Sequence, residues 1–461
     1  MTPSSAPKSA RRNQAAQSPA KSLSQDLLAK LQSRKATVGV VGLGYVGLPL
    51  ATAFAEAGFS VVGIDVDARR VKRLAKGESD IDDVSSERVA AAVKAGRFRA
   101  TDSYRGIAEC DAVVVCVPTP LRKNRDPDIS YIVSATESLV PFAHPGMLVI
   151  LESTTYPGTT REVVQPRLEA RQLRIGENVF LAFSPERIDP ANKKFGVKNT
   201  PKVVGGLTPD CTKLAAALYG AAVDTVVEVS SPEAAEMAKL LENTFRAVNI
   251  GLVNEIALLC ERLHLDVWEV VRAAATKPFG FMPFTPGPGI GGHCIPVDPL
   301  YLSWRVRGMD VKTRFIDIAD EVNRAMPAHT ANGVAELLNE CGKPVKGSSV
   351  LLLGVAYKKN VSDVRESPAI DVAKLLHERG AEITYFDPHV ESFQAEGFQV
   401  PRTLKIDPKS LSSFDAIVIL TDHTGVDYAA VLQHGKAVYD ARNATSGMPS
   451  KAKRRRLGSG V

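Results

Sequence analysis

The sequence predicts an α/β protein in which a long central helix joins two doubly wound, parallel-sheet domains. Three observations lead to this fold class. Short apolar strands alternate with helical segments from Thr37 onward, and the same alternation starts again at Ser349. Between the two runs, residues 231–263 carry apolar side chains at helical spacing without a break. At 461 residues, the chain is also too long for one ordinary core.

Each element follows from a local pattern. Short apolar runs bounded by turn residues predict the strands of the first domain at 37–41, 61–64, 112–116, 148–151 and 179–183. Ser231 and Pro232 suit the start of the long helix, because proline is favoured at the first helical position. A stretch rich in proline and glycine at 277–299 precedes a second helix at 313–341. The strands of the second domain are expected at 349–353, 382–386, 416–420 and 437–439.

The ends of the chain differ from its body in charge. The net charge is +6, but residues 1–36 carry +6 and residues 451–461 carry +5, which leaves about −5 for the rest. The ends have few aromatic residues, so 1–36 is predicted as a disordered basic tail and 447–461 as a second basic tail. We expect solvated tails whose removal leaves catalysis intact. Weak contact of residues 453–456 with a nucleic acid or a membrane surface is the alternative.

The composition is that of a soluble globular protein, with 44% hydrophobic and 23% charged residues. No apolar run is long enough to cross a bilayer, and the N-terminus lacks the apolar core of a secretory signal. Cytoplasmic localisation is therefore expected. The six cysteines have no CxxC spacing, so neither a metal site nor a disulfide framework is predicted.

A glycine motif follows the first strand. Gly42, Gly44 and Gly47 form G-x-G-x-x-G, which allows a tight turn, close approach of a pyrophosphate and close helix packing, as in a Rossmann-like domain. Asp65 ends the next strand, where a carboxylate binds the ribose hydroxyls and repels a 2′-phosphate. The motif therefore predicts NAD rather than NADP, although Arg70 lies nearby. A glycine-rich turn without a ligand is the alternative.

The second domain lacks this motif. Its first turn, residues 354–359, contains Lys358 and Lys359 in place of closely spaced glycines. It is interpreted as a site for a different phosphate-bearing ligand. A solvated pair of lysines remains the other interpretation.

Cys294 lies in a glycine-dense loop at 287–299, whereas structural cysteines usually lie in apolar runs. A nucleophilic cysteine needs a stabilised thiolate, and His293 or a nearby lysine could supply the positive charge. On spacing alone, a tight structural turn explains the loop equally well. Lys239 and Asn243 share one face of the long helix and could stabilise an oxyanion, or could be a solvated pair.

Four polar residues follow predicted strands of the first domain: Thr119, Glu152, Thr154 and Glu186. Open α/β sheets bind ligands at the carboxyl ends of their strands, so these residues are expected near a ligand.

Taken in order, seven motifs resemble the UDP-glucose/GDP-mannose dehydrogenase family from Thr37 to about Asn443. They are GLGYVGLP, VPTP, EST, SPER, the Lys239/Asn243 helix, GGHCIPVDP and GVAYKKNVSDVRES. Branches acting on UDP-glucose or GDP-mannose typically carry NPEF and a GGSC-type loop followed by Lys-Asp. SPER and HCIPVD resemble instead the branch that oxidises UDP-N-acetylhexosamines, and are most similar to UDP-N-acetylglucosamine 6-dehydrogenases. The chain also departs from the UDP-glucose branch at 276–279, where that branch usually keeps a substrate-binding arginine.

The resemblance implies an NAD-dependent enzyme that oxidises the C6 alcohol of UDP-N-acetylglucosamine to the carboxylate. The reaction takes two steps and two NAD per sugar, through a thiohemiacetal and a thioester on Cys294. Lys239 and Asn243 would hold the oxyanion, and Asp298 would orient or activate water. Glu186 and Thr119 would assist through ordered water.

The resemblance also assigns binding residues. The NAD contacts implied are Gly42, Leu43, Gly44, Tyr45, Val46, Gly47, Asp65, Arg70, Pro118, Thr119, Thr154 and Arg365. The UDP-sugar contacts implied are Glu186, Arg187, Ile188, Lys239, Asn243, Phe281, Gly289, Gly291, Tyr357, Lys358 and Arg442. The domains that the resemblance implies are an NAD-binding domain at 37–230, a central helical domain with the cysteine loop at 231–342, and a UDP-sugar-binding domain at 343–446.

Other functions stay open. The same chemistry on UDP-N-acetylgalactosamine, UDP-N-acetylmannosamine or UDP-glucose is the nearest alternative. A β-hydroxyacid dehydrogenase and a non-catalytic NAD-binding scaffold are more distant ones. A UDP-sugar is the expected partner, with no nucleic acid and no membrane span. A homodimer through the central helix is also expected, although burial of that helix within one chain is an equally ordinary explanation.

Overall fold

The computed structural model describes residues 19–81, 83–122, 124–188, 192, 194–292 and 294–460. The chain forms two compact units. Residues 1–118, 130–153 and 158–236 make up the first, and residues 119–129, 154–157 and 237–461 the second. The segments 119–129 and 154–157 thus pack with the second unit, although they connect strands of the first. No described helix is both long and apolar enough to span a membrane.

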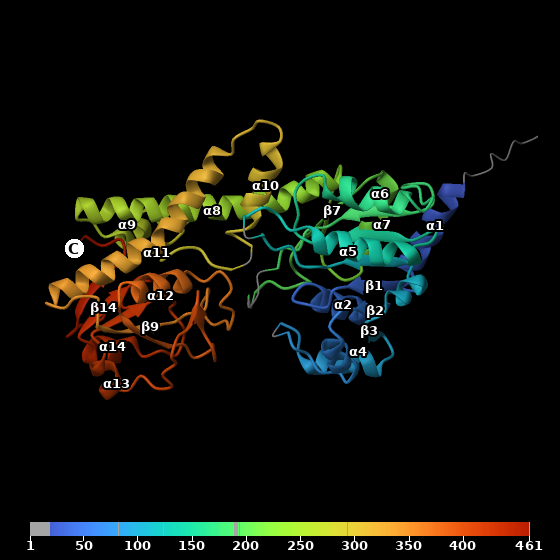
Figure 1. The fold of residues 1–461 in the computed structure, drawn as a ribbon. Coiled ribbons are helices and arrows are strands. Elements are labelled where there is room, and N and C mark those ends of the chain that lie inside the picture. Colours follow the sequence, from blue (N-terminus) through green and yellow to red (C-terminus); the bar gives the residue numbers. More distant parts are fainter. Residues whose placement is uncertain are drawn as a thin grey trace, which may run out of the picture. The chain divides into compact units, whose positions relative to one another are not determined.

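An eight-stranded sheet forms the core of the first unit, in the order β3-β2-β1-β4-β5-β6-β7-β8 (Figure 1). Its strands are β1 (Thr37–Val41), β2 (Ser60–Ile64), β3 (Phe98–Thr101), β4 (Ala112–Val115), β5 (Leu148–Leu151), β6 (Phe180–Phe183), β7 (Lys202–Gly206) and β8 (Val226–Val229). β1 to β6 are parallel, and β7 runs antiparallel to β6. The central strands are buried along their length because helices cover both faces.

The helices of the first unit alternate with these strands. They are α1 (Pro19–Gln32), α2 (Gly47–Glu56), α3 (Ala68–Ala75), α4 (Ser86–Lys94), α5 (Ser130–Leu139), α6 (Gln165–Glu169) and α7 (Pro209–Tyr219). Short 3₁₀ helices span Tyr104–Glu109 and Val140–Phe142, and a π-helical turn spans Thr160–Val164. The order of β3 to β6 is that of a doubly wound dinucleotide-binding sheet.

A five-stranded parallel sheet forms the core of the second unit, in the order β10-β9-β13-β14-β15. Its strands are β9 (Ser349–Leu353), β10 (Glu382–Phe386), β13 (Ala416–Ile419), β14 (Ala437–Asp440) and β15 (Lys453–Arg456), with a small hairpin of β11 (Gln394–Ala395) and β12 (Phe398–Gln399). The order repeats that of β2-β1-β4-β5-β6 in the first unit. The predicted fold class, with two doubly wound sheets, is confirmed.

The helices of the second unit are α9 (Val267–Ala274), α10 (Asp298–Arg307), α11 (Arg314–Glu340), α12 (Pro368–Glu378), α13 (Pro408–Ser413) and α14 (Tyr428–His434). The long helix α8 (Pro232–Leu263) agrees with the predicted segment, and all but its first turn belongs to this unit. Trp268 from α9 and Leu337 from α11 join the buried core beneath the sheet.

The prediction of a disordered tail over residues 1–36 is wrong for its described part. Helix α1 buries Leu27 and Leu31 in the core of the first unit and contacts α7. Lys30 on this helix forms an ion pair with Asp111 at 2.6 Å. A four-residue apolar spacing in a short, charged segment was too weak a signal to predict the helix. Residues 1–18 lie outside the described part of the chain.

The prediction of a solvated basic tail over 447–461 is also wrong. Residues 453–456 form β15, which pairs with β14 at the edge of the sheet. Their positive charges face carboxylates on helices: Lys453 pairs with Glu340 at 2.9 Å, and Arg456 pairs with Asp266 at 2.8 Å. A run of like charges is solvated only when the folded chain places no opposite charges beside it.

Three strands of the first sheet were not predicted. β3 and β8 lie at the two edges, where strands need no continuous apolar run. β7 contains a lysine and two glycines, and its lysine is satisfied by partners distant in the sequence.

Candidate active site

The glycine motif forms the turn between β1 and α2. Gly42 has φ +88°, and a Cβ atom there would lie 2.3 Å from the carbonyl oxygen of Cys116. A Cβ on Gly47 would lie 1.7 Å from the carbonyl oxygen of Gly42. Gly44 differs, because a Cβ there would meet nothing within 4 Å. Gly42 and Gly47 are thus required by the turn itself, whereas Gly44 leaves open space beside the backbone, as a dinucleotide site needs.

The other residues of the motif divide between core and surface. Leu43 is fully buried beneath the turn, and Tyr45 is exposed. Val46 precedes the first residue of α2 without a side-chain cap. The Leu48 N–H at the amino end of this helix donates to the carbonyl oxygen of Gly44 at 3.1 Å, so the glycine turn runs directly into the helix.

Asp65 follows β2 and is almost completely buried. Its carboxylate accepts the N–H of Leu43 at 2.8 Å and the N–H of Asp67 at 2.9 Å. Arg70 contacts Asp65 at 3.3 Å and Asp80 at 3.1 Å. The arginine that lies near the cofactor motif is therefore committed to two carboxylates, which weakens its case as a 2′-phosphate ligand.

The second unit has an aspartate at the matching position. Asp387 follows β10 and accepts the N–H groups of Val355 and Ala356 at 2.7 and 3.0 Å, as Asp65 accepts that of Leu43. It also accepts a bond from Nε2 of the buried His423 at 2.9 Å. The bond to His423 lowers the pKa of Asp387 to about 2 in spite of its burial. This carboxylate is fully buried among protein donors, so the second sheet does not repeat the ribose site of the first.

The cysteine loop packs on the second sheet through its glycines. A Cβ on Gly291 would lie 2.7 Å from Cβ of Tyr357, and one on Gly292 would lie 2.9 Å from the ring of Tyr357. Gly289 has φ +135° and faces Pro368. The loop therefore packs closely against Tyr357, itself a predicted substrate residue, and against Pro368.

Arg442 is anchored beside the same loop. Its Nε donates to the carbonyl oxygen of Leu420 at 2.9 Å, and a Cβ on Gly287 would lie 2.5 Å from one of its terminal nitrogens. Burial lowers the pKa of Arg442. Lys358 lies half-buried in the turn after β9, next to Tyr357.

Cys294, Lys239, Asn243 and Asp298 lie near one another in the second unit. Asp298 opens α10 and donates its N–H to the carbonyl oxygen of Cys294 at 2.8 Å. Asn243 donates from Nδ2 to a carboxylate oxygen of Asp298 at 2.5 Å. Lys239 lies one turn before Asn243 on α8, and both are buried.

The charges in this cluster act on one another. Burial raises the pKa of Asp298 to about 6, while Lys239 and the bond from Asn243 act to lower it. Burial also raises the pKa of Cys294 to about 11, and Asp298 adds to the rise. Lys239 acts in the opposite direction without cancelling it. The sequence suggested a stabilised thiolate, whereas burial in the structure raises the pKa of the Cys294 thiol. His293 lies outside the described residues.

Thr119 contacts helix α10, which begins at Asp298. Tyr301 is fully buried on α10, and its hydroxyl donates to the carbonyl oxygen of Thr119 at 2.8 Å. Arg125, in the same loop as Thr119, forms a two-pronged pair with Asp320 of α11 at 2.7 and 2.8 Å. Neither Tyr301 nor Arg125 was predicted, because their partners lie more than 180 residues away in the sequence.

Glu186 lies in the first unit and is held at both oxygens. One oxygen accepts the N–H of Ile188 at 2.6 Å, and the other contacts Lys202 at 3.2 Å. Arg187 donates to the carbonyl oxygen of Pro201 at 2.7 Å. Lys202 was not predicted, because a single lysine in a β-branched strand reads as a surface residue.

The remaining predicted residues are Phe281, Pro118, Thr154 and Arg365, and Arg365 lies beside the cysteine loop. Phe281 and Pro118 are exposed, and Thr154 is half-buried. Arg365 pairs with Asp363 at 2.6 Å and is half-exposed, while its carbonyl oxygen accepts the N–H of Gly292.

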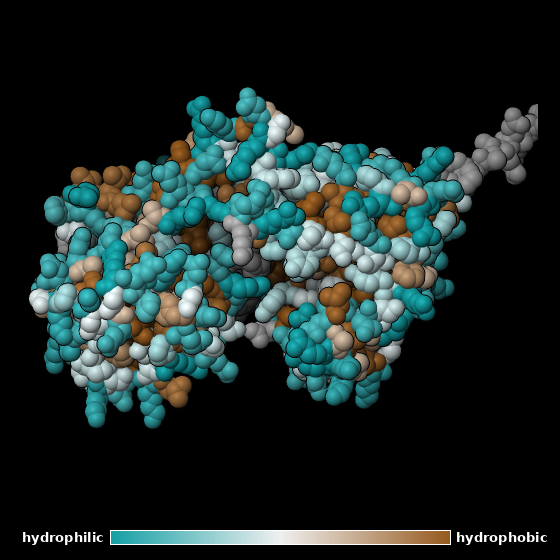
Figure 2. All heavy atoms as spheres, viewed as in Figure 1, coloured by the Kyte–Doolittle hydropathy of each residue, from teal (hydrophilic) through white to brown (hydrophobic). Residues whose placement is uncertain are grey.

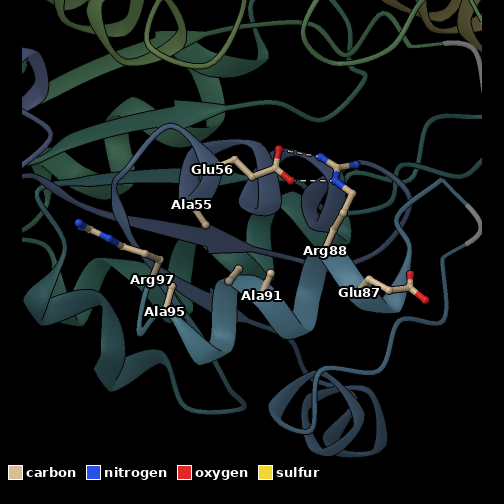
Figure 3. A pocket seen from close by; sticks show the side chains of 8 residues that line it. Ala55, Glu56, Glu87, Arg88, Ala91, Ala95 and Arg97 are labelled. Atoms are coloured by element: carbon tan, nitrogen blue, oxygen red, sulfur yellow. Dashed lines mark hydrogen bonds and ion pairs between the residues drawn. The ribbon is translucent and has the colours of Figure 1, made fainter.

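A hollow on the first unit lies apart from all predicted site residues. It has a volume of about 350 Å³, and Ala55, Glu56, Glu87, Arg88, Ala91, Ala92, Ala95 and Arg97 line it (Figure 3). Arg88 donates two hydrogen bonds across it to the two carboxylate oxygens of Glu56, at 2.8 and 2.9 Å.

The fold and the glycine turn define a class of protein: an oxidoreductase whose first unit binds a dinucleotide. Residues 36–223, 233–325 and 351–447 match the NAD binding, central and UDP binding domains of the UDP-glucose/GDP-mannose dehydrogenase family. The chain belongs to this family. It is an NAD-dependent UDP-sugar dehydrogenase, and the cofactor predicted from Asp65 is confirmed.

Relatives with different substrates are about equally similar. A UDP-N-acetyl-D-mannosamine dehydrogenase of Methanococcus maripaludis is 34% identical over 417 residues, 88% of this chain and 92% of that protein. A UDP-N-acetyl-D-glucosamine 6-dehydrogenase of Pseudomonas aeruginosa is 35% identical over 389 residues, 84% of this chain and 90% of that protein. The structure of a UDP-D-ManNAc dehydrogenase from Pyrococcus horikoshii superposes with a TM-score of 0.84 at 32% identity, covering 92% of this chain and 99% of that one.

Proposed function

We propose that this protein oxidises the C6 alcohol of UDP-N-acetylglucosamine to the carboxylate in two steps, through a thioester on Cys294. The observation that carries the proposal is the buried cluster of Cys294, Lys239, Asn243 and Asp298. A thiol beside an ammonium group, an amide and a carboxylate supplies a nucleophile, two oxyanion donors and a base. A dehydrogenase that stops at the aldehyde needs no such thiol.

NAD, held at the glycine turn, supplies the hydride acceptor for each oxidation. The Cys294 sulfur adds to the C6 aldehyde, and Asp298, ionised at neutral pH, accepts the thiol proton. Lys239 and Asn243 donate to the oxygen that becomes negative in the resulting thiohemiacetal. Its oxidation leaves a thioester, and water activated by Asp298 releases the uronate and restores the thiol. Each sugar therefore consumes two NAD.

The choice of sugar rests on the motifs after β6 and around Cys294. SPER and HCIPVDP support an N-acetylhexosamine, and relatives named for N-acetylglucosamine and for N-acetylmannosamine stand at similar identity. The epimers differ at one hydroxyl or acetamido position, so a few hydrogen bonds decide between them.

The test measures NADH formed per sugar consumed with UDP-N-acetylglucosamine, UDP-N-acetylmannosamine, UDP-N-acetylgalactosamine and UDP-glucose in parallel. We expect two NADH per sugar and the highest kcat/KM with UDP-N-acetylglucosamine. Higher kcat/KM with another of the four sugars would correct the substrate and keep the chemistry. One NADH per sugar would contradict the thioester step.

Asp298 is expected to set the acid side of the pH profile. Its pKa is raised to about 6, so the carboxylate loses its basic form as the pH falls through 6, and kcat falls with it. Asp298→Asn should lower kcat by at least about 100-fold and flatten this limb. Asp317→Asn on the neighbouring helix α11 is the control, because Asp317 bonds Ser303 and Thr313 instead. An unchanged limb in Asp298→Asn would contradict the assignment.

Asp65 is expected to discriminate against NADP. Replacing Asp65 with asparagine keeps an acceptor for the Leu43 N–H but removes the negative charge that repels a 2′-phosphate. The ratio of kcat/KM for NAD to that for NADP should fall at least about tenfold, because like-charge juxtaposition costs several kcal/mol. Asp67→Asn is the matched control. Equal use of NAD and NADP by the unchanged protein would overturn the expectation.

A homodimer through α8 completes the proposal. Leu241, Phe245, Leu252, Leu259 and Leu263 are 45–65% exposed and repeat at intervals of four and seven residues along this helix. Figure 2 shows apolar atoms gathered over the end of α8 next to α9. An exposed apolar stripe of this length is typical of a protein interface.

The dimer is tested by the mass in solution. We expect twice the chain mass of 49.5 kDa for the unchanged protein and a monomer for Leu252→Glu, because a charge would be buried without a partner. Lys213→Glu on the exposed face of α7 is the control. A Leu252→Glu variant that stays dimeric would exclude this stripe as the interface.

A further inference from the structure

Four ionisable side chains meet at the carboxyl end of the parallel strands β5 and β6 in the eight-stranded sheet. Glu152 directly follows β5, Glu186 lies three residues beyond β6, Lys202 opens β7, and Tyr219 closes α7. The antiparallel pairing of β7 with β6 aligns Phe183 with Gly205, so the start of β7 runs alongside the segment that follows β6. This reversal of one strand brings Lys202 to the end of the sheet where ligands bind in open α/β folds.

The four groups form a line of hydrogen bonds. The Tyr219 hydroxyl donates to Glu152, and Lys202 donates to the other oxygen of Glu152. Lys202 also donates to Glu186 at 3.2 Å. The remaining oxygen of Glu186 accepts the Ile188 N–H at 2.6 Å, so this carboxylate is fixed at both oxygens.

Burial increases toward the inner end of the line. The side chains of Glu152, Lys202 and Glu186 are 0, 8 and 14% exposed. Glu186 is thus the member nearest to solvent, and the groups behind it are sealed in the core. A buried cation with a carboxylate on either side is stable only as an intact set, because loss of one partner leaves an uncompensated charge.

The charges favour an ionised Glu186. Burial has the largest single effect and would raise its pKa, but the attraction of Lys202 and the hydrogen bonds from Ile188 and Lys202 together lower it. Burial raises the pKa of Glu152 to about 7, so Glu152 is the carboxylate that takes a proton first. Cys116, which also faces this set, has its pKa raised well above the ordinary value by burial and stays neutral.

We propose that Lys202 is a positioning residue for the reaction: backed by Glu152 and Tyr219, it holds Glu186 ionised and in one orientation. This inference rests on the proposed function, in which Glu186 assists through ordered water. Apolar side chains in place of the whole set could fill its site without loss of stability. The ion pair is useful because it supplies a carboxylate that keeps its charge and direction although it is mostly buried.

The test compares Lys202→Met, which keeps length and removes charge, with Lys213→Met on the exposed face of α7. In Lys202→Met, kcat should fall at least about tenfold while KM for NAD stays within about twofold. The acid limb, which Asp298 sets in the unchanged protein, should steepen and shift to higher pH, because loss of the adjacent cation raises the pKa of Glu186 by about one to three units and a second protonation then lowers kcat. Lys202→Arg, which keeps the cation, should restore the position of the limb.

A second variant covers the case in which Lys202→Met does not fold. The pair Lys202→Met with Glu152→Gln leaves no unpaired carboxylate at position 152, and the same shift of the acid limb is expected. A kcat–pH profile that coincides with that of Lys213→Met, in whichever of the two variants folds, overturns the proposal.

A direct titration separates this proposal from the proposed function. With ¹³C-labelled glutamate carboxyls, the Glu186 resonance is assigned by its loss in Glu186→Gln, and its pKa is read by NMR. The pKa should rise by about one to three units without Lys202 even if no UDP-sugar is turned over. An unchanged pKa of Glu186 in an active enzyme would overturn the role of Lys202 and leave the dehydrogenase assignment intact.

Discussion

A protein in which Cys294 is replaced by alanine should form no uronate and at most one NADH per sugar. Without the sulfur, the C6 aldehyde has no covalent partner, so the second oxidation loses its substrate. Carboxylate formation should fall at least about 1,000-fold, since removing a nucleophile that acts as a unit with its neighbours costs three or more orders of magnitude. Stopped assays with separation of the sugar products measure both quantities.

Cys341→Ala is the matched control. Cys341 is the exposed cysteine after α11, whereas Cys294 is half-buried beside Lys239 and Asp298, so the same atom change should leave activity untouched there. Two NADH per sugar from Cys294→Ala at the normal rate would remove the thioester from the mechanism. The family membership and the use of NAD would be unaffected.

Deletion of residues 451–461 is expected to destabilise the protein strongly. It removes strand β15 together with Leu457, which is fully buried and whose carbonyl oxygen accepts the indole N–H of Trp268 at 2.8 Å. Loss of one buried leucine costs about 2–5 kcal/mol, and an edge strand is lost in addition. The melting temperature should fall by about 10 °C or more, which calorimetry or circular dichroism measures.

Two single substitutions separate the contribution of Leu457 to this loss of stability from that of the charge at position 451. Leu457→Ala should reproduce about 2–5 kcal/mol of it. Lys451→Gln removes one positive charge of the same segment at an exposed position and should change stability by less than about 0.5 kcal/mol. An unchanged melting temperature after the deletion would mean that this segment is solvated, as its charge alone suggests.

Features that depend on neighbouring residues could be predicted from the sequence. β1, the glycine turn and Asp65 follow one another within 30 residues, so their meeting needs no knowledge of the rest of the chain. Lys239 and Asn243 lie one turn apart on α8, and helical periodicity alone places them side by side. Asp298 lies four residues after Cys294, and the start of α10 brings their backbones together.

Features that depend on partners distant in the sequence could not be predicted from it. The basic segment 453–456 reads as a solvated tail because Asp266 and Glu340, which neutralise it, belong to other helices. Lys202 reads as a surface lysine because Glu152 lies 50 residues earlier, and Tyr301 reads as a core aromatic because Thr119 lies 182 residues earlier. In each case the role of the residue depends on a partner that lies beside it only in the folded chain.

By itself, the sequence determined the fold class, the family and the use of NAD, and it pointed to the residues proposed to carry the cysteine chemistry. These depend on short motifs and on periodicity, in which each residue's role follows from its near neighbours. The tertiary structure alone decided that the described parts of both basic ends fold, that burial raises the pKa of the Cys294 thiol and that Lys202 pairs with Glu152 and Glu186. Burial and the pairing of opposite charges determine these properties, and both arise from atoms that are close in space and far apart in sequence.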